Sequence, residues 1–200
     1  MDYFNSNERE SQLKFAAFRD HLVTPLVHFL LKIHLTPNQI TYLGIIFLII
    51  ACFLNSPYMV ALFLMLYVIA DGIDGPLARA YGNNHEGGSI MDIYADQLGV
   101  VFLPAAASFH LDTNGTLAVL FSCGYIIFIV LVVYSNELHI VVKKFFRVKY
   151  PMYIFYTVCL FFNKEWMSYF FFVFCAYYWV KITFQLKTIY DFHGSTSGQK

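Results

Sequence analysis

Long apolar segments separated by short polar turns make up most of this chain. Six of these segments are long enough to cross roughly 30 Å of hydrocarbon as helices, allowing for tilt and polar ends. They cover residues 39–55, 57–80, 88–109, 115–136, 150–163 and 166–186. The fifth segment is the weakest, because it is short and polar residues border it. The pattern predicts an all-α, polytopic membrane helix bundle with six transmembrane helices.

The connections between these segments are brief, and none is long enough to separate two domains. We therefore expect a single membrane domain over residues 1–200. Its predicted parts are an interfacial helix at 1–35, a six-helix bundle at 36–186 and a polar tail at 187–200.

The residues before the first span follow an amphipathic helical pattern, which predicts a helix lying in the membrane interface. The alternative is a helix that packs on the protein's own surface. The apolar stripe contains Phe15, Phe18, Leu22, Leu26, Phe29 and Ile33, and the opposite side contains Lys14, His21, His28 and Lys32.

The hexapeptide "TPNQIT" at 36–41 carries the signals of a helix start. Thr36 can cap the helix, Pro37 suits the first helical position, and Gln39 completes a capping box. The first span should therefore begin here.

Composition supports a membrane protein. Of the 200 residues, 58% are hydrophobic and 13% are charged, whereas soluble domains have about 25% charged residues. There are too few charges to cover a water-facing surface. The formal net charge of zero argues against nucleic acid as a partner.

Lysine and arginine residues collect on the cytoplasmic side of membrane proteins. Six spans with an inside N-terminus place every lysine and arginine except Lys164 on or near that side. This distribution predicts that both termini are cytoplasmic. It also predicts that the polar residues around Arg79 lie at the cytoplasmic face.

Four aspartates between residues 71 and 96 interrupt the apolar pattern. Spacings of three and four place each pair of aspartates on one helix face together with small residues. If the two helices run antiparallel, all four carboxylates can converge. The shared faces contain Asp71, Asp74, Gly75 and Ala78 on one helix and Gly88, Asp92 and Asp96 on the other.

Carboxylates at membrane depth require cations, because desolvation and mutual repulsion are both costly. Oxygen ligands without His or Cys suit Mg²⁺, Mn²⁺ or Ca²⁺ rather than zinc. Arg79 could bind an anionic oxygen, and the small residues leave space, so a phosphate substrate is indicated. Alternatively, Arg79 is a snorkelling residue at a helix end, and the glycines allow close helix packing.

The stretch "DGIDGPLARAYGNNHEGGSIMDIYAD" resembles the CDP-alcohol phosphatidyltransferase family. The family pattern is D-x-x-D-G-x-x-A-R followed, after eight or so residues, by G-x-x-x-D-x-x-x-D. This chain matches all eight fixed positions, over 26 residues. The "TPNQIT" sequence and six helices after an interfacial helix also look like this family.

The resemblance implies phospholipid biosynthesis. A phosphatidyl group would pass from CDP-diacylglycerol to the hydroxyl of a small polar alcohol, with release of CMP and with two Mg²⁺ or Mn²⁺ ions. It also implies a homodimer in contact with membrane lipids.

The resemblance also implies roles for the motif residues. Asp71, Asp74 and Asp92 would be metal ligands, and Asp96 a ligand or the catalytic general base. The residues implied to bind the CDP-lipid are Asp71, Gly75, Ala78, Arg79 and Gly88.

The acceptor alcohol remains open. Gln97 follows the last aspartate where family members acting on glycerol phosphate or inositol often carry Lys or Arg, which disfavours a phosphorylated acceptor. In contrast, Lys143, Lys144 and Arg147 are candidate contacts for an acceptor phosphate or for lipid headgroups.

Two other classes of function are compatible with intramembrane aspartates. One is another Mg²⁺-dependent intramembrane transferase that uses diphosphates, and the other is a non-enzymatic cation carrier. The carrier would have no need of Arg79 beside its cation site.

Overall fold

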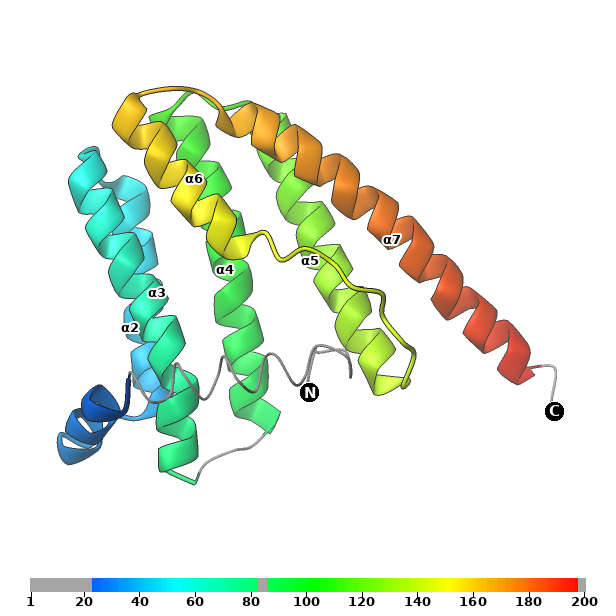
Figure 1. Cartoon of the computed structure of the whole chain (residues 1–200), viewed down its shortest axis with the longest axis horizontal. Coiled ribbons are helices and arrows are strands. Elements are labelled where there is room, and N and C mark those ends of the chain that lie inside the picture. Colours follow the sequence, from blue (N-terminus) through cyan, green and yellow to red (C-terminus); the bar gives the residue numbers. More distant parts are fainter. Residues whose placement is uncertain (1–22, 83–85, 198–200) are drawn as a thin grey trace. The chain divides into compact units, whose positions relative to one another are not determined.

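The computed structural model describes residues 23–82 and 86–197, and no strand occurs within them (Figure 1). A first helix, Val23–Lys32, precedes six longer ones. The longer helices are α2 Pro37–Phe53, α3 Pro57–Ala80, α4 Glu86–His110, α5 Gly115–Glu137, α6 Lys149–Phe162 and α7 Met167–Ser197. The chain divides after Ala106, inside α4, into two compact units that are described separately below.

The six labelled helices lie at the six predicted positions, which confirms the all-helical fold. Four of them are long and apolar enough to cross a membrane: Pro57–Ala80, Ile90–His110, Gly115–Glu137 and Met167–Gly194. The chain is therefore a multi-pass membrane protein.

Two of the six predicted spans have the predicted lengths but are too short to count alone as membrane-crossing helices. Helix α2, with 17 residues, passes the same test only together with Val23–Lys32, from which it is bent by 111°. Helix α6 has 14 residues, or about 21 Å of helix, which is less than the thickness of the hydrocarbon core. Residues 140–148 before it are not helical, which limits its length.

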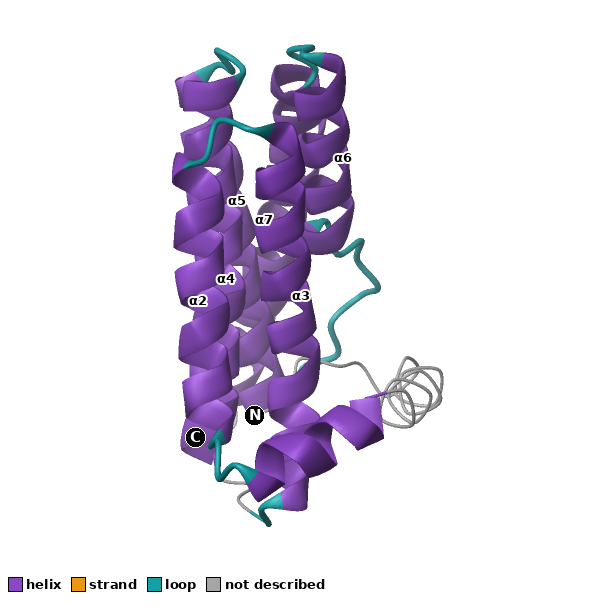
Figure 2. Ribbon diagram, turned by 90° about the vertical axis from the view of Figure 1, so that its left-hand side faces the viewer, coloured by secondary structure: helices purple, strands orange, loops and turns teal. Residues whose placement is uncertain are grey.

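In the first unit, α2 and α3 pack side by side (Figure 2). Gly44 makes this approach possible, because a Cβ at this position would lie 3.1 Å from the Cβ of Ala70. The predicted capping box at the start of α2 is confirmed. The Thr36 N–H donates to Gln39 Oε1 at 2.8 Å, and the Gln39 N–H donates to Thr36 Oγ1 at 3.4 Å.

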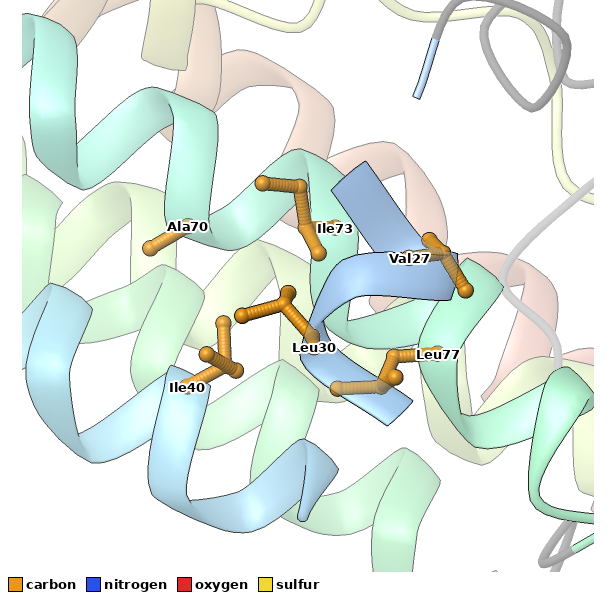
Figure 3. Close-up of a cluster of buried hydrophobic side chains, with 6 residues drawn as sticks. All are labelled: Val27, Leu30, Ile40, Ala70, Ile73 and Leu77. Atoms are coloured by element: carbon orange, nitrogen blue, oxygen red, sulfur yellow. The ribbon is translucent and has the colours of Figure 1, made fainter. Parts of the chain in front are cut away.

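The helix Val23–Lys32 has two apolar faces with different surroundings. On one face, Val27 and Leu30 are buried in a cluster with residues of α2 and α3 (Figure 3). The other members of this cluster are Ile40, Ala70, Ile73 and Leu77. The face with Leu26, Phe29 and Ile33 is exposed.

Both sequence interpretations of this helix therefore describe part of it. The helix packs on the protein's own surface through one face, and its exposed apolar face is available to the membrane interface. His28 and Lys32 of the predicted polar side are exposed, and five residues of the predicted pattern lie outside the described part of the chain: Lys14, Phe15, Phe18, His21 and Leu22.

The second unit is built on the pairing of α5 with α7. Its core is aromatic: Phe121 stacks on Phe171 with ring centroids 5.0 Å apart, and Tyr125 meets Tyr178 edge to face at 5.1 Å. A buried hydrogen bond of 2.7 Å from Gln185 Nε2 to Ser135 Oγ joins the two helices. Helix α7 continues to Ser197, so most of the predicted polar tail is helical.

Candidate functional site

Three of the four predicted aspartates form one group in the first unit. Asp71 on α3 and Asp92 and Asp96 on α4 each offer a carboxylate oxygen, and these oxygens all lie within 4.8 Å of one another. Asp71 and Asp96 are half-buried, whereas Asp92 is exposed. Like charges this close repel strongly where water is scarce, so the group favours a bound cation.

Asp74 is buried and lies outside this group of three. Its Oδ2 accepts a hydrogen bond of 2.9 Å from the Thr41 hydroxyl on α2, and its Oδ1 accepts one of 2.7 Å from the Gly75 N–H. Its carboxylate also interacts electrostatically with Asp92 and Asp71. Asp74 is thus held by α2 beside the same site.

Two hydroxyl side chains that the sequence analysis did not single out help to position the aspartates. Thr41 shares its single hydroxyl proton between the Asp74 carboxylate, at 2.9 Å, and the Pro37 carbonyl, at 3.2 Å. Tyr67, one turn before Asp71, donates to the Ala95 carbonyl at 3.2 Å and so joins α3 to α4 beside Asp96. The only signal for Thr41 was its place at the end of "TPNQIT", and Tyr67 gave none.

The small residues of α3 border open space. A Cβ at Gly72 would meet nothing within 4 Å, and one at Gly75 would meet only Arg79 Nη1, at 3.6 Å. The Arg79 guanidinium therefore folds back along α3 over Gly75, one helical turn before it. Ala78 on α3 and Gly88 on α4 are half-buried.

The donor set fits a hard divalent cation such as Mg²⁺ or Mn²⁺. The grouped ligands are all carboxylate oxygens, which these ions prefer over the nitrogen and sulfur ligands typical of zinc. The guanidinium of Arg79 beside the open space over Gly75 suits an anionic oxygen. The arrangement can therefore hold cations and a phosphate group together.

The three candidate cations of the linker between α5 and α6 belong to the second unit and differ in their surroundings. Lys143 and Lys144 are exposed. The Lys144 carbonyl accepts a hydrogen bond of 3.0 Å from Lys181 Nζ, and Arg147 lies over the ring of Phe145 at 5.6 Å.

Comparison with known proteins identifies relatives over most of the described chain. A family model described as CDP-alcohol phosphatidyltransferase matches residues 34–186. A phosphatidylinositol phosphate synthase of Cutibacterium acnes is 28% identical over 117 residues, which are 54% of this chain and 55% of that protein. An uncharacterized protein of Aquifex aeolicus is 31% identical over 101 residues, 49% of this chain and 52% of its own length. The alignments thus span about half the length of these curated relatives.

Crystal structures of phosphatidylinositol phosphate synthase from Mycobacterium tuberculosis share the fold. One, in complex with manganese and citrate, has a TM-score of 0.69 at 16% identity and covers 84% of this chain and 88% of its own. Another, with CDP-DAG bound, has a TM-score of 0.70 at 17% identity and covers 85% and 94%.

Replacing Thr41 by Val keeps the side-chain shape but removes the hydroxyl donor to the buried Asp74 carboxylate. We expect Thr41→Val to lower the free energy of unfolding by about 1–3 kcal/mol, the cost of a buried acceptor left without its partner. Thermal unfolding in detergent micelles measures this loss. Thr41→Ser, which retains the hydroxyl, should unfold close to the wild-type temperature. Equal stability of the Val variant and the wild type would show that the hydrogen bond contributes nothing.

Proposed function

Because the chain belongs to the CDP-alcohol phosphatidyltransferase family, we propose that it transfers a phosphatidyl group from CDP-diacylglycerol to a small polar alcohol. The observation that carries this proposal is the group of Asp71, Asp92 and Asp96. These residues occupy fixed positions of the family motif and bring their carboxylates together from two helices. The product nucleotide would be CMP, and the lipid product a phospholipid.

We propose that two Mg²⁺ or Mn²⁺ ions bind here, with Asp71, Asp74, Asp92 and Asp96 as ligands. The proximity of three carboxylates and the electrostatic interaction of the Asp74 carboxyl group with two of them support this assignment. When bound, such ions supply positive charge that stabilises both the entering and the leaving oxygen of a displacement at phosphorus.

The donor would be held by residues of both motif helices. Arg79 is proposed to bind a phosphate oxygen of the donor, supported by its place over the open face of Gly75. Asp71, Gly75, Ala78 and Gly88 are the other proposed contacts of the CDP-lipid. The small residues at positions 75, 78 and 88 keep the space beside the carboxylates free for a nucleotide.

Asp96 is proposed as the general base as well as a metal ligand. The acceptor hydroxyl oxygen forms a bond to the lipid-side phosphorus while the bond from that phosphorus to the CMP oxygen breaks. The hydroxyl proton passes to a carboxylate oxygen of Asp96, and CMP leaves with the bonding electron pair. The half-buried position of Asp96 and the link of its neighbour Ala95 to Tyr67 support a fixed orientation for this task.

The acceptor is proposed only as a small polar alcohol. The neutral Gln97 beside Asp96 favours an acceptor without phosphate. The relatives named as phosphatidylinositol phosphate synthases, and the linker cations Lys143, Lys144 and Arg147, favour a phosphorylated one. An acceptor panel must therefore include both kinds.

We further propose that both termini and the aspartate site face the cytoplasm and that the protein is a homodimer. The distribution of lysine and arginine along the chain supports the orientation. Cysteines introduced in residues 83–85 and 112–114 test it. An impermeant thiol reagent applied from outside intact cells should label only the second group, and labelling of the first would reverse the orientation.

A turnover assay with labelled CDP-diacylglycerol tests the reaction and names the acceptor. Purified protein with Mg²⁺ should release CMP when one member of a panel of alcohols is present. EDTA should abolish release, and Mg²⁺ or Mn²⁺ should restore it, because the clustered carboxylates need a counter-charge. A cation carrier would release no CMP with any alcohol. Full turnover in EDTA would contradict the metal assignment.

Replacing Asp96 should affect turnover, whereas replacing Asp71 should affect donor binding. We expect Asp96→Asn to lower turnover by at least ~100-fold, the low end of general-base effects, while CDP-lipid still binds with Mg²⁺. Asp71→Asn should instead weaken the binding of the donor. Single-turnover kinetics and equilibrium donor binding separate the two effects. If Asp96→Asn loses donor binding as Asp71→Asn does, Asp96 acts mainly as a metal ligand.

A further inference from the structure

We infer that a groove between α5 and α7 in the second unit binds an anionic phospholipid from the surrounding membrane. The groove is a cavity of about 800 Å³, in the upper part of the range found for small-molecule sites. Its walls come from α5, the α5–α6 linker and α7. The groove involves none of the motif aspartates, and it shares one residue with the proposed transfer reaction, Lys143, a candidate contact of an acceptor phosphate.

Along α7 the lining of the groove is apolar at its start and mixed from Lys181 onward, where Phe184 lies between two lysines. Val173, Ala176 and Val180 line one part, and Lys187 and Asp191 lie farther along the same helix. Val173 and Lys187 are 14 residues apart, which is about 21 Å along a helix. The groove thus changes from apolar to partly charged over a distance that suits a lipid chain and its headgroup.

The floor of the groove is closed by buried contacts between α5 and α7. Phe128 on α5 is buried, and its ring meets Tyr178 with centroids 5.7 Å apart. Beside it, Gln185 lines the groove and donates to Ser135 Oγ. A ligand in the groove therefore lies on top of the packed α5–α7 interface and does not enter the core of the unit.

Three lysines and one aspartate give the charged part a positive balance. Lys143 projects from the linker, and Lys181 and Lys187 from α7. Lys181 donates a hydrogen bond to the Lys144 carbonyl, and its Nζ lies 5.6 Å from the centre of the Tyr177 ring. Neither contact neutralises the positive charge of Lys181. Lysine clusters at a membrane surface attract acidic lipid headgroups.

The apolar part favours a lipid over a free phosphate. Val173, Val180 and Phe184 line the groove and are exposed. In a membrane these side chains meet acyl chains, and they offer nothing to inorganic phosphate. The ligand that uses both parts of the groove is an anionic amphiphile.

The test counts bound lipid on the full-length purified protein by native mass spectrometry. Phosphatidylglycerol and phosphatidylcholine with the same acyl chains are titrated separately. The wild type should retain phosphatidylglycerol in preference to phosphatidylcholine. The double variant Lys143→Gln/Lys187→Gln should bind phosphatidylglycerol more weakly, by about fivefold for each lysine removed. The preference between the two lipids should largely disappear.

Lys32→Gln/Lys164→Gln is the matched control. It removes the same charge from two exposed lysines that do not line the groove, so its phosphatidylglycerol binding should equal that of the wild type. Ala176→Phe fills the apolar part without changing charge and should weaken binding of phosphatidylglycerol. Circular dichroism confirms that each variant is folded.

Three results would overturn the proposal. The first is equal retention of both lipids by the wild type, and the second is equal loss in the matched control. The third is displacement of phosphatidylglycerol by millimolar inorganic phosphate, together with unchanged binding in Ala176→Phe, which would assign the lysines to a free phosphate.

Discussion

Repulsion among closely placed carboxylates is the constraint on which the first unit depends. Asp71, Asp92 and Asp96 approach within 4.8 Å of one another in a chain that is otherwise apolar. Such a group would separate if the helices could move apart, because the repulsion is weakly screened at membrane depth. A hydrogen bond between the two helices opposes this, because the Tyr67 hydroxyl on α3 donates to the Ala95 carbonyl on α4. This bond helps to hold the carboxylates together, and a bound cation would offset the remaining repulsion.

The parts of the fold and site that were predictable from the sequence depend on local periodicity. Steps of three and four residues place side chains on one helix face whatever the neighbours are, so the shared faces of Asp71 with Asp74 and of Asp92 with Asp96 needed no tertiary information. Helix starts with strong local signals, such as the capping box at Thr36, were equally predictable. Contacts between elements were not. A tyrosine or threonine hydroxyl has many possible partners, and nothing in spacing alone selects the Ala95 carbonyl for Tyr67.

The ends of α6 and α7 show a different limit of sequence analysis. Hydropathy reports where a segment leaves the hydrocarbon, whereas a helix ends only where its backbone is interrupted. Lys181 and Lys187 lower the hydropathy of α7 without breaking it, so the helix continues for three more turns. The linker before α6 shows no regular spacing of apolar residues that would predict a helix or a strand. Its cations are similar in sequence, yet Lys143 lines the groove whereas Arg147 lies over Phe145.

The close approach of α2 and α3 at Gly44 sets the distance between these two helices near the aspartate site. Gly44 lies three residues beyond Thr41, and Ala70 lies four residues before Asp74, so each is about one helical turn from its end of the hydrogen bond. The lack of a side chain at Gly44, where a Cβ would come within 3.1 Å of the Ala70 Cβ, therefore permits the helix spacing that the Thr41 hydroxyl has to span. Natural variation in side-chain size at these two positions would be transmitted to the Asp74 carboxylate. A residue on neither motif helix, such as Gly44, can thus change the geometry of the carboxylate site.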